Sequence, residues 1–107
     1  MSNETEKFTE EGQLTVDVYQ TATEVIIQST VAGTASADID IALAKDMVTI
    51  RGARHNGEKI SPDAYDHREL YWGPFSRSII LPTEIDVERS KAVIKNGLLT
   101  IKLPKLI

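Results

Sequence analysis

The 107-residue sequence contains no cysteine, and this absence excludes disulfide bonds, thiolate chemistry, iron–sulfur clusters and cysteine-based zinc sites. It also lacks any apolar run close to the ~20 residues that a membrane-spanning helix requires. The chain starts Met-Ser-Asn-Glu-Thr-Glu-Lys, which is acidic, whereas a signal peptide is basic and then apolar. These absences predict a cytoplasmic protein with no membrane span.

Groups that serve catalysis or metal binding are scarce. The two histidines, His55 and His67, lie in loop-like sequence and supply at most half of a zinc site, so two exposed loop residues are the simpler interpretation. Asp38 and Asp40 have the spacing of paired carboxylates, but on a strand both would face solvent with no loop to wrap a cation. No Gly-x-Ser-x-Gly elbow and no glycine-rich phosphate loop occurs. We therefore expect no metal, no cofactor and no enzymatic activity.

Positive charge is in the minority, with 12 Lys and Arg against 16 Asp and Glu and a net charge of −4. The basic residues are scattered along the sequence, whereas proteins that bind nucleic acid cluster them to neutralise phosphates. This charge pattern argues against nucleic acid as the main partner. The hydrophobic fraction of 41% is that of an ordinary soluble domain, and the chain is long enough for one hydrophobic core.

The segment 1–12 is predicted to be a flexible acidic arm, because it is rich in glutamate and carries one aromatic side chain, Phe8. A single domain is predicted at 13–105. The last two residues, 106–107, are interpreted as a truncated tail.

Within the domain, apolar residues alternate with polar ones in short runs. Leu14, Val16 and Val18 predict a half-buried strand over 14–19, and the β-branched run 24–31 predicts a second strand. The cleanest alternation places three apolar side chains on one face of a strand and acidic or small residues on the other. Those three side chains are Ile39, Ile41 and Leu43.

A turn at 45–46 leads into the strand 47–51, and a polar loop of unusual length then runs over 54–73. Inside this loop, the segment 65–70 has the composition of a short strand. The apolar pattern returns at 75–81, and 83–90 is predicted to be an extended connection.

The last hairpin gives the strongest local prediction. Asn96-Gly97 between two apolar runs favours a two-residue type I′ turn, because both residues tolerate positive φ. Pairing outward from this turn sets Ile94 opposite Leu99 and Ala92 opposite Ile101, with Val93 and Thr100 together on the other face. Seven to nine such short strands with almost no helical periodicity predict an all-β, immunoglobulin-like antiparallel β-sandwich.

Two features go beyond packing. Parity places Arg77 on the same face as Phe75 and Ile79, so its guanidinium needs a partner unless a bulge at 73–74 releases it to water. The second feature is the strand 39–43, which would offer unpaired backbone groups and an apolar row if it lay at a sheet edge. Simple core packing explains the same alternation, so both interpretations of this strand stay open.

Two segments, 69–82 with its Gly-x-Phe-x-Arg motif and 92–105 with its Asn-Gly-x-Leu motif, together resemble the α-crystallin domain of the small heat shock proteins (Hsp20 family). Residues 69–82 read Glu-Leu-Tyr-Trp-Gly-Pro-Phe-Ser-Arg-Ser-Ile-Ile-Leu-Pro, which matches the family pattern except for the additional tryptophan. Residues 92–105 read Ala-Val-Ile-Lys-Asn-Gly-Leu-Leu-Thr-Ile-Lys-Leu-Pro-Lys and match the family ending without departure. The resemblance is to bacterial and archaeal members and covers about ninety residues.

The resemblance implies a homodimer formed by exchange of a loop strand, which in this family pairs with the partner's second strand. The interface residues it implies are Leu14, Val16, Val18, Tyr65, Asp66, His67, Arg68, Glu69, Leu70 and Arg77. It also implies a groove between the family's fourth and eighth strands, which receives an Ile-x-Ile tail or a client. By position, this groove would be lined by Ile39, Ile41, Leu43, Val93 and Ile94.

The function implied is an ATP-independent holdase that binds exposed hydrophobic segments of unfolding client proteins and slows their aggregation. The missing Ile-x-Ile tail and the short arm imply a dimer rather than a large cage. The alternative is a co-chaperone or adaptor module of the related CS/p23-like type, which docks a folded partner and would be monomeric. An enzyme or metal carrier with a sandwich fold is the least favoured alternative.

Overall fold

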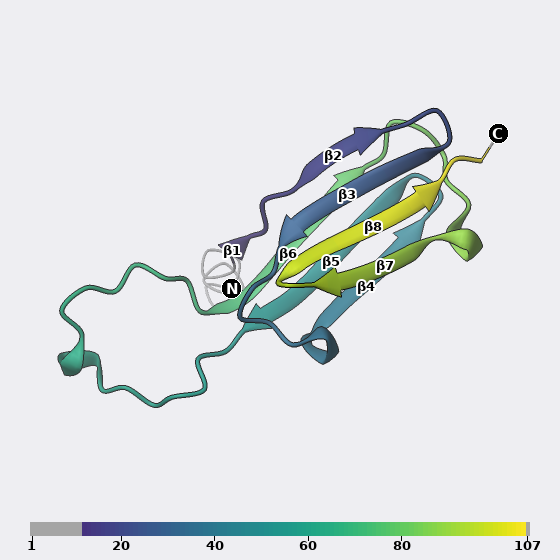
Figure 1. Cartoon of the computed structure of the whole chain (residues 1–107). Coiled ribbons are helices and arrows are strands. Elements are labelled where there is room, and N and C mark those ends of the chain that lie inside the picture. The colour runs from purple at the N-terminus through teal and green to yellow at the C-terminus, as the bar shows by residue number, and fades with distance from the viewer. Residues whose placement is uncertain (1–11, 107) are drawn as a thin grey trace, which may run out of the picture.

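The computed structural model describes residues 12–106 of the chain. They form eight strands and three short 3-10 helices, shown in chain order in Figure 1. The strands are β1 (Gly12–Gln13), β2 (Asp17–Gln20), β3 (Glu24–Thr30), β4 (Ile39–Ala44), β5 (Met47–Arg54), β6 (Gly73–Ile80), β7 (Lys91–Lys95) and β8 (Leu98–Pro104). The 3-10 helices are η1 (Ser36–Asp38), η2 (Pro62–Ala64) and η3 (Val87–Arg89). Most of the predicted acidic arm (1–11), and the last residue of the predicted tail (107), lie outside the described residues.

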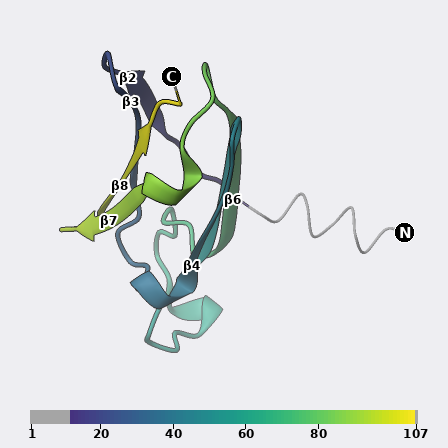
Figure 2. The same cartoon turned by 90° about the vertical axis from the view of Figure 1, so that its right-hand side faces the viewer.

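The strands form two four-stranded sheets in the orders β1-β6-β5-β4 and β2-β3-β8-β7. Figure 2 shows the two sheets packed face to face, which confirms the predicted all-β sandwich. Five of the six strand pairs are antiparallel, and the two-residue pair β1–β6 is parallel. No helix among residues 12–106 is long and apolar enough to cross a membrane.

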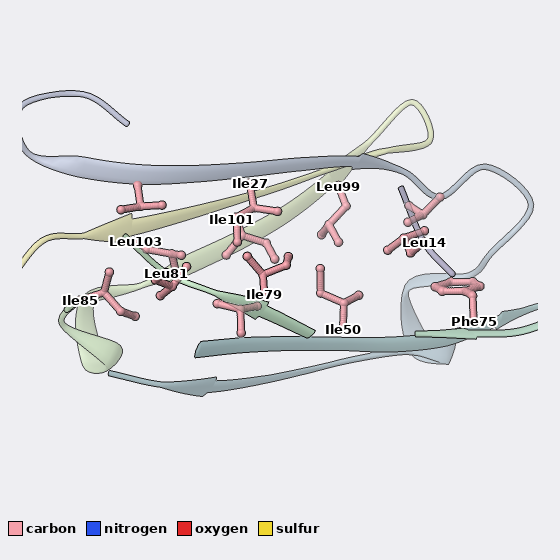
Figure 3. Close-up of a cluster of buried hydrophobic side chains, with 13 residues drawn as sticks. Leu14, Ile27, Ile50, Phe75, Ile79, Leu81, Ile85, Leu99, Ile101 and Leu103 are labelled. Atoms are coloured by element: carbon pink, nitrogen blue, oxygen red, sulfur yellow. The ribbon is translucent and has the colours of Figure 1, made fainter. Parts of the chain in front are cut away.

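The core lies between the sheets and follows the period of two that strands impose on side chains. The inward residues of the central strands β3, β5 and β8 are almost completely inaccessible to solvent, and Figure 3 shows several of them pointing toward one another. Burying one such aliphatic side chain contributes about 1.5–3 kcal/mol. The fully buried members from these three strands are Val25, Ile27, Val48, Ile50, Leu99, Ile101 and Leu103.

The β7–β8 hairpin has the predicted register. Ile94 pairs with Leu99 and Ala92 pairs with Ile101. Both turn residues have positive φ, 54° at Asn96 and 78° at Gly97, as a type I′ turn requires. The sequence prediction is therefore confirmed here at the level of individual side-chain pairs.

The predicted continuous strand over 14–19 is wrong. Only 17–19 of this range lie in a strand, β2, while 14–16 form no strand and cross from β1 in one sheet to β2 in the other. Leu14 is held at this crossing because its side chain is buried in the core and its N–H donates to the Ser76 carbonyl at 3.1 Å. The buried hydroxyl of Ser29 donates to the Thr15 carbonyl at 2.7 Å, which ties the crossing to β3.

The connection over 83–90 is less extended than predicted, because it contains η3. It covers the end of the sandwich through Ile85, which is completely buried and forms an isolated bridge with Lys105. The N–H of Leu106 donates to the Glu84 carbonyl at 2.9 Å. The last described residues are therefore fastened to this connection.

The long polar loop is present as predicted and joins β5 to β6 over residues 55–72. Figure 1 shows it extending beyond the end of the sandwich, with η2 as its only regular element. The segment 65–70, predicted to be a short strand, forms no strand in the single chain. A strand needs a neighbour to accept and donate its backbone hydrogen bonds, and residues 12–106 of the single chain offer this segment none.

Candidate functional site

The strands β4 and β7 end their respective sheets, and both lie on the same side of the sandwich. Figure 2 looks onto this side, with β7 in one sheet and β4 in the other. Within the described part of the chain, each strand has a sheet neighbour on one side only, β5 for β4 and β8 for β7. Backbone groups on the opposite side of such a strand are open to pairing with an added strand.

Four of the five predicted groove residues face inward along this side, and we call them the apolar border: Ile39, Ile41, Leu43 and Ile94. Each is half-buried and packs against the core, so part of each side chain remains accessible. The pairing of Ile41 with Ile50 and of Leu43 with Val48 places fully buried side chains directly behind β4. The border is therefore an accessible continuation of the core.

Val93, the fifth predicted groove residue, does not join the apolar border. It neighbours Ile94 in the same strand, so the pleat directs the two side chains to opposite faces. Val93 is 59% exposed and pairs with Thr100 on the outer face of its sheet. The pairing predicted from the Asn96-Gly97 turn places Val93 and Thr100 together on the face away from Ile94. That prediction agrees with the structure, whereas the assignment of Val93 to the groove does not.

The predicted dimer residues on the first strand separate. Leu14 is buried in the core and Val16 packs against it, whereas Val18 lies on β2 and is exposed. All four residues of β2 are exposed, and β2 ends its sheet beside β3. The surface that remains open to a partner strand here is thus β2 itself, Asp17–Gln20.

The predicted exchange segment 65–70 makes few contacts with its own sandwich. Its one backbone hydrogen bond among the described residues is local, from the Tyr65 N–H to the Pro62 carbonyl at 3.5 Å. The Arg68 guanidinium lies 4.7 Å from the centre of the Tyr65 ring. Asp66, His67 and Glu69 are exposed, and Leu70 is 74% exposed. The segment therefore has unpaired backbone groups and an apolar side chain in water.

Arg77 is intermediate between the two interpretations of its environment. It lies on the inner face opposite Ile50, as parity predicts, but it is only half-buried. One guanidinium nitrogen, Nη1, donates to the Leu14 carbonyl at 2.9 Å. This bond satisfies one of the N–H donors of the guanidinium and joins β6 to the crossing segment.

The sequence analysis did not identify the residues that hold the base of the loop. The Arg54 Nε and Nη2 atoms donate to the carbonyls of Ala32 at 2.9 Å and Thr30 at 3.1 Å, and the guanidinium lies 5.2 Å from the Phe75 ring centre. The Tyr71 hydroxyl accepts from the Gly12 N–H at 3.0 Å and donates to the Pro74 carbonyl.

These contacts border an open hollow of about 370 Å³ lined by Thr30, Ala32, Gly33, Arg54, Leu70, Tyr71 and Trp72. In the sequence, the two adjacent aromatic residues Tyr71 and Trp72, just before Gly73-Pro74, could have indicated this hollow.

Within residues 12–106, no group of three or more His, Asp or Glu side chains is placed to hold a metal ion. His55 and His67 are both exposed in the loop, as the simpler interpretation of them expects. The described part of the site thus consists of sheet edges and apolar side chains. Such an arrangement can bind peptide segments by strand addition and apolar contact.

Residues 17–107 match the sequence model of the Hsp20/alpha crystallin family. The chain is 33% identical over 89 residues to small heat shock protein C4 of Rickettsia felis, covering 83% of this chain and 55% of that protein. It is 32% identical over 93 residues to heat shock protein 16 of Schizosaccharomyces pombe, covering 85% of this chain and 65% of that protein. The chain thus spans about half to two-thirds of the length of these curated relatives.

Solved structures share the same architecture. Heat shock protein 16.0 from Schizosaccharomyces pombe superposes with a TM-score of 0.81 at 30% identity, covering 90% of this chain and 89% of that one. The hspA protein of Xanthomonas axonopodis superposes with a TM-score of 0.79 at 24% identity, covering 89% and 95%, which supports the fold. The match of the family model over residues 17–107, together with these relatives, shows that the chain belongs to the Hsp20/alpha crystallin family of small heat shock proteins.

Proposed function

We propose that this chain is an ATP-independent holdase, which binds exposed hydrophobic segments of unfolding proteins and prevents their aggregation. Membership of the small heat shock family implies a chaperone role. The observation that carries the proposal is the apolar border, where half-buried Ile and Leu side chains lie along the edge strand β4. No described residues cover the outer side of that strand in the sheet order.

The physical basis is the match between this edge and a partly unfolded protein. Such a protein exposes apolar side chains and unpaired backbone groups, which otherwise associate with those of a second unfolded molecule. A segment added along β4 gains backbone hydrogen bonds, and its alternate side chains pack on Ile39, Ile41 and Leu43. Binding is reversible, and it makes and breaks no covalent bond.

We further propose that two copies pair by exchanging the loop segment 65–70. Two observations support this: the segment lacks backbone pairing with its own sandwich, and β2 is an exposed edge strand. Adding the segment to the partner's β2 would satisfy both sets of backbone groups and remove Leu70 from water. Arg77 would contribute indirectly, because its bond to Leu14 fixes the chain that leads into β2.

The holdase proposal is tested by light scattering from a heat-aggregating test protein, with and without this chain and without nucleotide. We expect scattering to fall as the chain is added, and to fall less with Leu43→Ser. The matched control is Ala42→Ser, which changes the opposite face of the same strand. Undiminished scattering would contradict the proposal, and if accompanied by a monomeric mass in solution it would favour a CS/p23-like adaptor.

The exchange is tested separately by mass measurement in solution. Replacing the segment 65–70 with a Gly-Ser sequence of equal length keeps the reach of the loop and removes its strand-forming side chains. We expect this variant to be monomeric, while the same replacement over 55–60 leaves the dimer intact. A dimeric mass for the first variant would exclude pairing through this segment.

A further inference from the structure

The outer face of the β7–β8 hairpin combines positive charge with exposed apolar groups. We call it the lysine face and define it as Lys91, Val93, Lys95, Leu98, Thr100 and Lys102. Together with Asn96, these residues line an open depression of about 770 Å³. This hairpin ends one sheet (Figure 1), and its register places the lysine face on the opposite side of that sheet from the buried Leu99 and Ile101.

Two properties of this face cost stability when it is exposed to water alone. Lys91 lies directly opposite Lys102 in the register, and like charges in such a cross-strand pair are destabilising. Within residues 12–106, none of the three lysines has a carboxylate within salt-bridge distance. On the same face, Val93 is 59% exposed and Leu98 is 37% exposed. The face therefore holds apolar surface as well as charge.

The face is also opposite in sign to the chain as a whole, whose net charge is −4. The segment that complements it best in this sequence is 1–11. That segment contains four glutamates against one lysine, and its one aromatic residue is Phe8. We propose that the lysine face is a docking surface for residues 1–11, with the glutamates near the lysines and Phe8 on Val93 and Leu98.

The segment's attachment point makes this docking sterically feasible. Residue 12 pairs with Phe75 at the end of the sandwich where Arg54 binds the Thr30 carbonyl, and Thr30 pairs with Leu98 of the lysine face. Eleven extended residues reach about 36 Å at ~3.3 Å each. The shortest dimension of the molecule is 21 Å. The segment is therefore long enough to cross from one sheet to the outer face of the other.

Docking of this kind depends on charge, because surface ion pairs weaken as salt screens them. It covers Val93 and Leu98 at low ionic strength and leaves them exposed at high ionic strength. This proposal does not depend on the holdase activity proposed above, since the lysine face and the apolar border lie on different faces of the molecule.

The test is carbodiimide cross-linking of the intact chain at low salt, which condenses a nearby carboxylate and lysine amine into an amide, followed by mass spectrometry. We expect cross-links between glutamates of the segment 1–11 and Lys91, Lys95 or Lys102. Their yield should fall about two- to fivefold for each glutamate–lysine ion pair that a substitution removes. Cross-links from this segment confined to other lysines, such as Lys45 or Lys59, would overturn the proposal.

Charge reversal gives a second, independent readout. In intact chains with labelled methyl groups, the double change Lys91→Glu and Lys102→Glu should shift the Val93 and Leu98 signals. Adding Glu10→Lys and Glu11→Lys should restore them, whereas Lys59→Glu in the loop should have no effect.

Failure of the reversed pair to restore the signals would count against docking of residues 1–11. Signals that respond to an added unfolded protein, and not to changes in residues 1–11, would assign the face to clients and overturn the proposal.

Discussion

Gly52 is predicted to be irreplaceable by alanine for reasons of space. A Cβ atom built at this position would lie 2.7 Å from Cζ of Phe75 and 2.9 Å from the carbonyl oxygen of Asp38. Neither neighbour moves easily, since Phe75 is 2% exposed in the core and the Asp38 carbonyl belongs to the backbone just before β4. Gly52 also pairs with Ile39, so a side chain added at this position would lie next to the apolar border.

The cost of Gly52→Ala follows from two opposing effects. Overpacking a close-packed site costs about 1–3 kcal/mol. Alanine stiffens the unfolded chain relative to glycine, which stabilises the fold by about 0.4–1 kcal/mol. The net expectation is a loss of about 1–2 kcal/mol, which corresponds to a fall in Tm of about 4–8 °C in a domain of this size.

Thermal unfolding followed by circular dichroism measures this difference. The matched control is Gly57→Ala in the loop, where no atom lies within 4 Å of the added Cβ. We expect the control to change the free energy of unfolding by less than about 0.5 kcal/mol. Equal melting temperatures for Gly52→Ala and the parent chain would show that Phe75 and the Asp38 backbone shift at no cost here, and would refute the packing argument.

Three further substitutions test the site. Ser29→Ala should cost about 1 kcal/mol in urea unfolding, because the Thr15 carbonyl loses its donor, and an unchanged midpoint would contradict this. Arg77→Met should cost about 1.5–3 kcal/mol, since a charged hydrogen bond to the crossing segment is lost, and full stability would show that the guanidinium is bonded to water instead. Leu43→Ser should weaken capture of an added Ile-x-Ile peptide several-fold in a fluorescence titration, while Ala42→Ser should not; equal affinities would place the peptide elsewhere.

The sequence predicted best where local geometry decides the structure. The Asn96-Gly97 turn admits few conformations and determines every pair in its hairpin, so one dipeptide specified the side chains on both faces. The alternation over 39–43 likewise gave the inward row of β4. Both predictions use the period of two, which needs no knowledge of distant residues.

The sequence predicted worst where a distant contact overrides the local pattern. The alternation at 14–18 is regular, yet the Leu14 side chain is buried in the core, whereas Val18 is exposed on β2, which ends its sheet. The contacts that separate them come from Ser76 and Ser29, and no local pattern could indicate them. The segment 65–70 is a related case, because a strand forms only against a neighbour, and this segment has none among the described residues of its own chain.

We expect the fold to tolerate substitutions in the apolar border, because side chains at the edge of the sheet are less buried than those at its centre. Val48 and Ile50 are completely inaccessible, whereas Leu43 and Ile41, paired with them in the adjacent strand, remain half-exposed. A polar substitution at the edge therefore removes only part of the burial energy that a core substitution would remove. Peptide capture and stability can thus be separated by experiment, so that a border variant which melts like the parent but captures no peptide identifies the binding surface.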